Sequence, residues 1–170
     1  KTESFDTFGK ILPRAAEIAR SISSIYLTLT VLCALAYVVG GLKPFDAVVH
    51  AMTTIATGGF ANADTSFTNL GAGVEYVGAV FMLAASLPFV RYVQLVGGSA
   101  KPLLHDSQIR AFFAVAVLVV LSLTVWLLTS STVSAELSFR KALFNGVSIL
   151  TGTGYASADY MLWGSFPIAV

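Results

Sequence analysis

Charge is the property that this sequence most clearly lacks. Of its 170 residues, only 11% are Asp, Glu, Lys or Arg, whereas 56% are hydrophobic, and the mean hydropathy is +0.80. Soluble domains carry about 25% charged residues, so this chain has less than half of the charge that a water-exposed surface needs. The composition therefore predicts an integral membrane protein. A net charge of +1 also gives no basic surface for binding nucleic acid.

Cysteine is nearly absent, because the chain has only Cys33, which lies within an apolar run. A single thiol cannot form an internal disulfide or a cysteine metal centre, so we expect Cys33 to be a small buried residue. Neither His50 nor His105 has a second ligand at metal-binding spacing. No catalytic triad or paired acid and base is present either. The sequence therefore predicts no enzyme, no transition-metal site and no bound cofactor.

Long apolar runs take the place of charge. Residues 22–39 are 18 in number, close to the roughly 20 that a helix needs to cross a membrane core. Two further runs of this kind lie at about 71–93 and 109–128. Small residues in the second run suit close helix packing, and Pro88 predicts a kink in it. The sequence thus predicts three membrane-spanning helices.

Two shorter helices are expected at about 45–56 and 138–150, after the first and third runs. Pro44 and Asp46 favour a helix start at the first of them. A helix of about 12 residues is only about 18 Å long, which is too short to cross a membrane. Irregular backbone at such depth is tolerated only where it is buried in protein or lines a wet cavity. These two helices are therefore expected to be re-entrant pore helices.

The loops after these short helices share a pattern. Thr57-Gly58-Gly59-Phe60-Ala61 returns, 95 residues later, as Gly152-Thr153-Gly154-Tyr155-Ala156. Glycine allows backbone angles that turn successive carbonyl oxygens toward one axis, where they can replace the water shell of K⁺. The short helices would aim their partly negative C-terminal ends at the same cavity. The candidate ion ligands are the carbonyl oxygens of eight loop residues: Thr57, Gly58, Gly59, Phe60, Gly152, Thr153, Gly154 and Tyr155.

The order of these elements predicts four segments. They are a cytoplasmic lead-in, 1–21; a complete pore unit, 22–93, with its filter loop at 57–61; a cytoplasmic linker, 94–108; and a truncated second pore unit, 109–170, with its loop at 152–156. The fold class is therefore an all-α membrane protein of span, pore helix, loop and span units. Seven of the ten Lys and Arg residues fall in 1–21 and 91–110, which favours that side as cytoplasmic. Pro13 is expected to break or kink the lead-in helix.

With these loops in this order, the sequence resembles the Trk/Ktr/HKT potassium transporter superfamily, and most of all its TrkH branch. The resemblance covers essentially the whole chain, which looks like the second unit and the first part of the third among that family's four. It implies potassium uptake across the bacterial inner membrane through a pore at the centre of four units, with K⁺ as cargo. It also implies a homodimer and a cytosolic nucleotide-binding regulatory subunit. Gly59 and Gly154 match the family's filter glycines. Ala61 and Ala156 stand where a potassium channel has its last glycine, which implies looser selectivity.

Two alternatives remain open. A sodium-preferring or sodium-coupled member of the same superfamily would have the same elements, although glycine at both filter positions favours potassium. A structural membrane subunit would use its glycine loops only for packing. A nucleotide loop at 152–154 is disfavoured, because no strand precedes it and Ser157 replaces the third glycine. His50 is expected to pack or to form a hydrogen bond. Asp64 and Asp159 are expected to cap the turns that leave the loops, and attraction of cations to the outer mouth of the pore is the alternative.

Overall fold

The computed structural model describes residues 3–130 and 132–164, and this part of the chain is helical with no strand. The helices are α1 (Glu3–Val39), α2 (Pro44–Ile55), α3 (Ala72–Ala85), α4 (Phe89–Val96), α5 (Lys101–Leu104), α6 (Ser107–Ser130), α7 (Ala135–Leu150) and the 3₁₀ helix η1 (Tyr160–Trp163). The predicted all-α class is confirmed. Residues 165–170, which the sequence assigns to the truncated second unit, lie outside the described residues.

Two helices in the described part are long and apolar enough to cross a membrane. They are the section Ala15–Val39 of α1 and the whole of α6, with mean hydropathies of 2.1 and 2.7. Large apolar side chains on both are exposed, among them Leu27 and Leu35 on α1 and Leu118 and Leu121 on α6. An exposed apolar surface of this extent suits lipid or further protein.

The predicted second span, 71–93, is not one straight helix. It consists of α3 and α4, whose axes differ by 87° across a short break. Pro88 explains the break, because proline lacks the N–H of a helical hydrogen bond and disfavours helical angles at the preceding residue, Leu87. The sequence predicts a kink here, and the structure shows a right-angled turn. With 14 residues, α3 alone is about 21 Å long.

The lead-in segment and the first span form one helix, because α1 continues from Glu3 to Val39 without a break. Pro13 was expected to break or kink the lead-in helix, and it does not break it, since it lies inside α1. A proline removes one helical hydrogen bond, and here the turns on either side continue the helix.

The linker 94–108 is ordered by an ion pair and contains α5. The guanidinium of Arg91 on α4 donates to Asp106 Oδ2 at 2.6 and 3.0 Å. Asp106 Oδ1 accepts from the N–H groups of Gln108 and Ile109 at the start of α6. These backbone hydrogen bonds, together with Arg91, hold the pKa of Asp106 below its ordinary value of 3.8. Asp106 therefore fixes the entry into α6.

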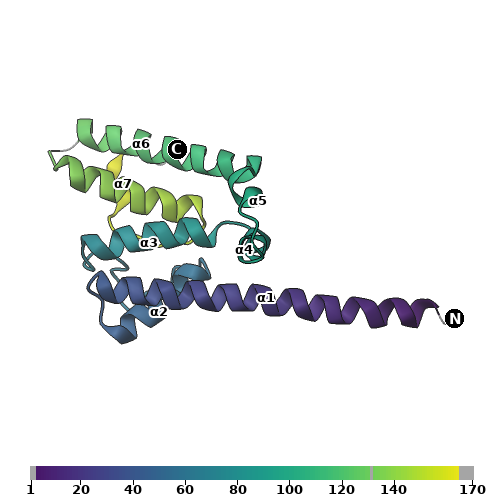
Figure 1. Cartoon of the computed structure of the whole chain (residues 1–170). Coiled ribbons are helices and arrows are strands. Elements are labelled where there is room, and N and C mark those ends of the chain that lie inside the picture. The colour runs from purple at the N-terminus through teal and green to yellow at the C-terminus, as the bar shows by residue number, and fades with distance from the viewer. Residues whose placement is uncertain (1–2, 131, 165–170) are drawn as a thin grey trace.

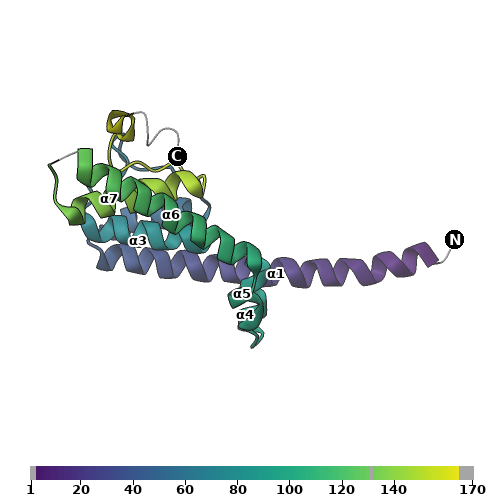
Figure 2. The ribbon, with the colours of Figure 1, turned by 90° about the horizontal axis from the view of Figure 1, so that it is seen from above.

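The helices pack side by side in the order α1, α3, α7 and α6 (Figure 1), and α2 packs against α1 and α3. The N-terminal half of α1 extends beyond the other helices in both views (Figure 2). This arrangement places α2 and α7, with the loops that follow them, in one half of the molecule.

Small residues allow α3 to lie close to its neighbours. A Cβ on Gly78 would lie 2.9 Å from the Phe144 ring and 3.1 Å from the Tyr37 hydroxyl. A Cβ on Gly73 would lie 3.1 Å from the carbonyl oxygen of Gly40 at the end of α1. The predicted close packing is present at both glycines.

Candidate functional site: two glycine loops after short helices

The two short helices end in the same hydrogen-bond pattern. After α2 the bonds are Ala56 N to Met52 O (3.1 Å), Thr57 N to Thr54 O (3.1 Å) and Gly58 N to Thr53 O (2.7 Å). After α7 they are Thr151 N to Val147 O (2.9 Å), Gly152 N to Ile149 O (3.0 Å) and Thr153 N to Ser148 O (2.9 Å). Every donor and acceptor in the second set lies 95 residues after its counterpart. The sequence repeat is therefore also a repeat of backbone structure at these helix ends.

The backbone angles of the two loops alternate in the same way. The φ angle is positive at Thr57 (48°) and Gly59 (67°) in the first loop, and at Gly152 (72°) and Gly154 (88°) in the second. The residues between them do not have positive φ. Glycine adopts positive φ without steric cost, whereas at Thr57 the Cβ atom comes close to the following carbonyl oxygen, so the conformation is strained. The four positions correspond in pairs, so both loops have one conformation.

Most of the candidate carbonyl oxygens have no hydrogen-bond partner within the described part of the chain. Of the eight, only that of Phe60 accepts a hydrogen bond, from the Thr53 hydroxyl at 2.9 Å. The carbonyl of Ala156, the last residue of the second loop, accepts from Phe67 N at 2.9 Å. Seven of the eight candidate carbonyl oxygens are therefore free of hydrogen bonds within the described residues and are available to an ion.

The two loops touch each other at Gly59. A Cβ at this position would overlap the carbonyl oxygen of Thr153, and it would lie 3.2 Å from the carbonyl carbon of Gly154. At Gly154, by contrast, a Cβ would meet nothing within 4 Å. Gly59 is thus needed both for its φ angle and for the close approach of the second loop.

Tyr155 connects the second loop to the first short helix. Its hydroxyl contacts the Thr53 hydroxyl and lies 3.3 Å from Thr54 Oγ1 and 3.2 Å from the His50 carbonyl oxygen. Its ring centroid lies 4.4 Å from that of Phe67. Tyr155 is 1% exposed, whereas its counterpart Phe60 is 75% exposed. The matching aromatic positions therefore have opposite environments in this chain.

The segment after the second loop is held by polar groups on α7, the buried Asn145 and the half-buried Lys141. Ser157 N donates to Asn145 Oδ1 (3.0 Å), Asn145 Nδ2 donates to Ser157 Oγ (3.1 Å), and Lys141 Nζ donates to the Ser157 carbonyl (2.7 Å). After the first loop, Asn62 Nδ2 donates to Asp46 Oδ1 at 2.8 Å in an exposed position. Sequence reasoning missed Lys141 and Asn145, although the offset of 95 residues aligns them with Asp46 and His50.

A buried carboxylate adjoins this segment. Glu75 on α3 is 1% exposed, and its Oε1 accepts from Lys141 Nζ at 2.8 Å and from Arg140 Nη1 at 2.9 Å, both on α7. Arg140 also pairs with Glu136 at 2.8 Å. A lone buried carboxylate would be costly, and two cations compensate it here. No sequence pattern singled out Glu75, because its partners lie about 65 residues away.

His50 packs in the core, as the sequence predicts. It is buried, and its Nδ1 lies 2.7 Å from the Asp46 carbonyl oxygen. Its ring meets the Phe67 ring edge-on at 5.2 Å. The described residues contain no cluster of three or more His, Cys, Asp or Glu that would hold a metal ion. Asp159 Oδ1 accepts from Met161 N at the start of η1, so it caps a turn as predicted.

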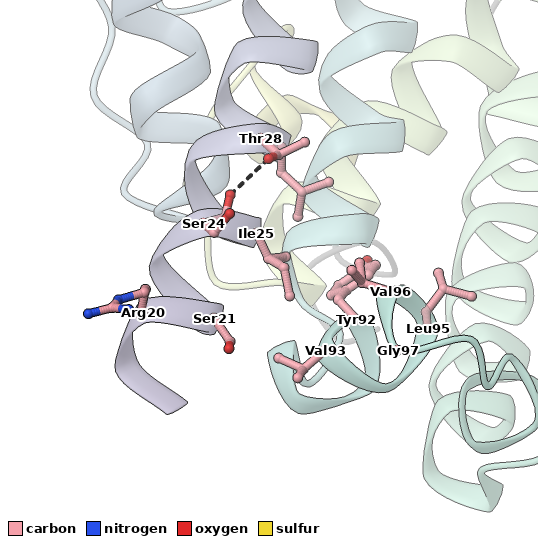
Figure 3. A pocket seen from close by; sticks show the side chains of 11 residues that line it. Arg20, Ser21, Ser24, Ile25, Thr28, Tyr92, Val93, Leu95, Val96 and Gly97 are labelled. Atoms are coloured by element: carbon pink, nitrogen blue, oxygen red, sulfur yellow. Dashed lines mark hydrogen bonds between the residues drawn. The ribbon is translucent and has the colours of Figure 1, made fainter. Parts of the chain in front are cut away.

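A hollow of about 640 Å³ lies elsewhere, between α1 and α4 (Figure 3). Ser21 and Ser24 from α1 and Tyr92 and Val96 from α4 line it, with Arg20 at its edge. The Thr28 hydroxyl is bonded to the Ser24 carbonyl at 2.8 Å. None of the eight loop residues lines this hollow. The candidate site is therefore the pair of loops and not this groove.

The comparison with known proteins names the family. A family model described as TrkH, cation transport protein, matches residues 6–167. The chain belongs to the TrkH family. This is a family of cation transport proteins and not of enzymes, and the family resemblance stated from the sequence is confirmed.

Two curated relatives illustrate the similarity. The chain is 47% identical over 169 residues to the Trk system potassium uptake protein TrkI of Halomonas elongata, which covers 96% of this chain and 34% of the relative. It is 32% identical over 162 residues to the Trk system potassium uptake protein TrkH of Escherichia coli K12, and this match covers 93% of this chain and 33% of the relative. The chain therefore spans about a third of the length of these TrkH-family relatives.

A solved structure supports the fold. The crystal structure of the potassium transporter TrkH from Vibrio parahaemolyticus matches with a TM-score of 0.83 at 35% identity, over 89% of this chain and 34% of that one. Together with the apolar helices, this similarity confirms the predicted class, an all-helical membrane protein of the TrkH family.

Proposed function

We propose that this chain is part of a potassium uptake protein of a bacterial cytoplasmic membrane, and that its two loops form two sides of an ion filter. The observation that carries the proposal is the shared loop conformation: positive φ at the first and third positions of both loops, with unpaired carbonyls. Curated relatives named as potassium uptake proteins support potassium as the ion.

Ion coordination follows from the backbone. A backbone that alternates between positive and ordinary φ can turn successive carbonyl oxygens to one side, and a ring of such oxygens can replace the hydration shell of K⁺. Thr57, Gly58, Gly59 and Phe60 would contribute from one loop, and Gly152, Thr153, Gly154 and Tyr155 from the other. The C-terminal ends of α2 and α7 precede these loops, and their partial negative charge favours a cation.

Two loops cannot surround an ion, so the proposal requires further loops from the rest of a longer chain. Gly59 of the first loop contacts the second loop, whereas the space beside Gly154, the matching residue of the second loop, is open. This open space supports a position for the next loop beside Gly154. The family resemblance adds a homodimer and a cytosolic nucleotide-binding regulatory subunit to the proposal.

Rubidium uptake by proteoliposomes that contain the full-length protein, with sodium as competitor, tests this function. We expect saturable uptake that prefers rubidium to sodium. Gly154→Val should abolish this preference, because a β-branched residue is strained at a φ of 88°. Gly98→Val is the matched control: Gly98 has a φ of 90° and open space for a Cβ, but lies in the linker. We expect the control to keep the wild-type preference.

The same measurement separates the alternatives. Equal or greater uptake of sodium would replace the proposal with a sodium-preferring or sodium-coupled transporter. No ion uptake by correctly folded protein would favour a structural subunit whose loops only pack.

A further inference from the structure

The buried carboxylate of Glu75 joins the two units, and its contacts lead on to the second loop. It lies on α3, in the first unit, while the two cations that it binds, Arg140 and Lys141, lie on α7 in the second. Lys141 is the cation that continues to the second loop, because its ammonium also donates to the Ser157 carbonyl at 2.7 Å. Glu75, Lys141 and Ser157 thus form a continuous chain of contacts between the units.

This chain of contacts ends close to the candidate filter. Ser157 is three residues after Gly154, so their Cα atoms lie within about 11 Å of each other, given 3.8 Å per residue. Ser157 is itself 1% exposed and is also bonded through its N–H and hydroxyl to Asn145. Because Lys141 donates to the Ser157 carbonyl, every polar group of Ser157 forms a hydrogen bond with a residue of α7. The end of the second loop is therefore held by α7 from one side, and α7 is held by Glu75 from the other.

We propose that Glu75 is a positioning residue for the second loop: it holds the Lys141 ammonium against the Ser157 carbonyl and so fixes the loop's exit. The contact also offsets the positive charge of Lys141 close to a cation path. Without Glu75, the Lys141 ammonium would lose its counter-charge, and because its side chain is 17% exposed, it would turn toward solvent and leave the Ser157 carbonyl. This inference rests on the proposed function, since it assigns Glu75 a part in selecting the ion.

Glu136 provides a matched control within the same cluster. It carries the same charge and pairs with the same Arg140, but it is 57% exposed at the side chain and has no bond to Lys141. Its other partner is the hydroxyl of Tyr76, at 3.2 Å. Loss of the Glu136 charge therefore changes the cluster's net charge as much as loss of the Glu75 charge does, without touching the path to Ser157.

The test compares Glu75→Gln and Glu136→Gln in the full-length protein, in proteoliposomes, by the ratio of rubidium to sodium uptake. This ratio does not depend on how much protein is folded or inserted. We expect Glu75→Gln to lower it about tenfold, the size of losing one charge-assisted hydrogen bond. Glu136→Gln should leave the ratio unchanged. An unchanged ratio in Glu75→Gln, or an equal fall in Glu136→Gln, would overturn the inference.

A double variant tests whether Glu75 acts through Lys141. Lys141→Gln should itself lower the ratio, and Glu75→Gln added to it should lower the ratio no further, since coupled residues are not additive. Full additivity of the two effects on the uptake ratio would contradict the proposal.

If Glu75→Gln does not fold, the test rests on Lys141→Gln. A wild-type ratio of rubidium to sodium uptake in that variant would then refute the inference. Absence of rubidium uptake by the wild type would overturn the proposed function, whereas normal wild-type uptake with an unchanged variant ratio overturns only the role of Glu75.

Discussion

The first and second loops have the same backbone conformation but different support. Both follow a short helix that ends in the same three hydrogen bonds, and both have positive φ at their first and third positions. The second loop is held by the buried side chains of Tyr155 and Asn145 and by the half-buried Lys141. The first has an exposed Phe60 and one exposed hydrogen bond at Asn62.

The difference shows that loop conformation and loop support have separate origins. The conformation follows from residues next to each other in the sequence, namely a helix end followed by glycine. The support comes partly from the loop's own helix, through Asn145 and Lys141 on α7, and partly from the neighbouring unit, because Tyr155 reaches Thr53 and Thr54 on α2. The second loop has such a neighbour within this chain. If the two loops belong to a ring of pore loops, as proposed, the exposure of Phe60 predicts that another unit supports the first loop.

The largest expected effect is a difference in stability between substitutions at the two loop glycines, Gly59 and Gly154. Alanine at positive φ costs about 1–2 kcal/mol at either position. Only at Gly59 would the new Cβ also overlap backbone, that of Thr153, and overpacking adds about 1–3 kcal/mol. We therefore expect Gly59→Ala to lower the unfolding midpoint of the full-length protein more than Gly154→Ala does. Thermal unfolding in detergent checks this order. Equal losses would show that Gly154 has an equally close neighbour in the complete protein.

An intermediate effect tests the aromatic positions. Tyr155→Phe keeps the ring among Phe67 and Phe144 but removes the hydroxyl from Thr53 and His50 O. We expect a loss of about 1 kcal/mol in the free energy of unfolding, the net value of a typical hydrogen bond. Phe60→Leu serves as the comparison and should cost less, because Phe60 is exposed in this chain. A greater loss in Phe60→Leu would identify a buried contact supplied by another unit.

The smallest effect concerns the first position of each loop, where threonine in one corresponds to glycine in the other. Thr57→Gly should change stability by less than about 0.5 kcal/mol, because relief of positive-φ strain offsets the added freedom of glycine in the unfolded chain. The reverse exchange, Gly152→Thr, should cost about 1 kcal/mol for the same strain. Unfolding midpoints of both variants provide the measurement. A large loss in Thr57→Gly would mean that the Thr57 side chain has a role beyond its 2.8 Å bond to the Ala56 carbonyl.

Much of the candidate site was predictable because the sequence repeats itself. Gly59 and Gly154 stand out by their shared offset, and glycine there has a direct physical reason in its φ angle. The short helices were predictable from their length and from Pro44. By contrast, the right-angled turn between α3 and α4 was predicted only as a kink, because proline breaks a helix without fixing the direction that follows.

The sequence by itself determined the membrane environment, the positions of most helices and the glycines that shape the two loops, because each depends on composition or on residues a few positions apart. Only the tertiary structure decided what holds the loops in place. Glu75 meets Lys141, and Tyr155 meets Thr53, because helices from distant parts of the chain pack side by side. No local pattern encodes such contacts: a buried charge or hydroxyl acquires its partner only when the fold has formed.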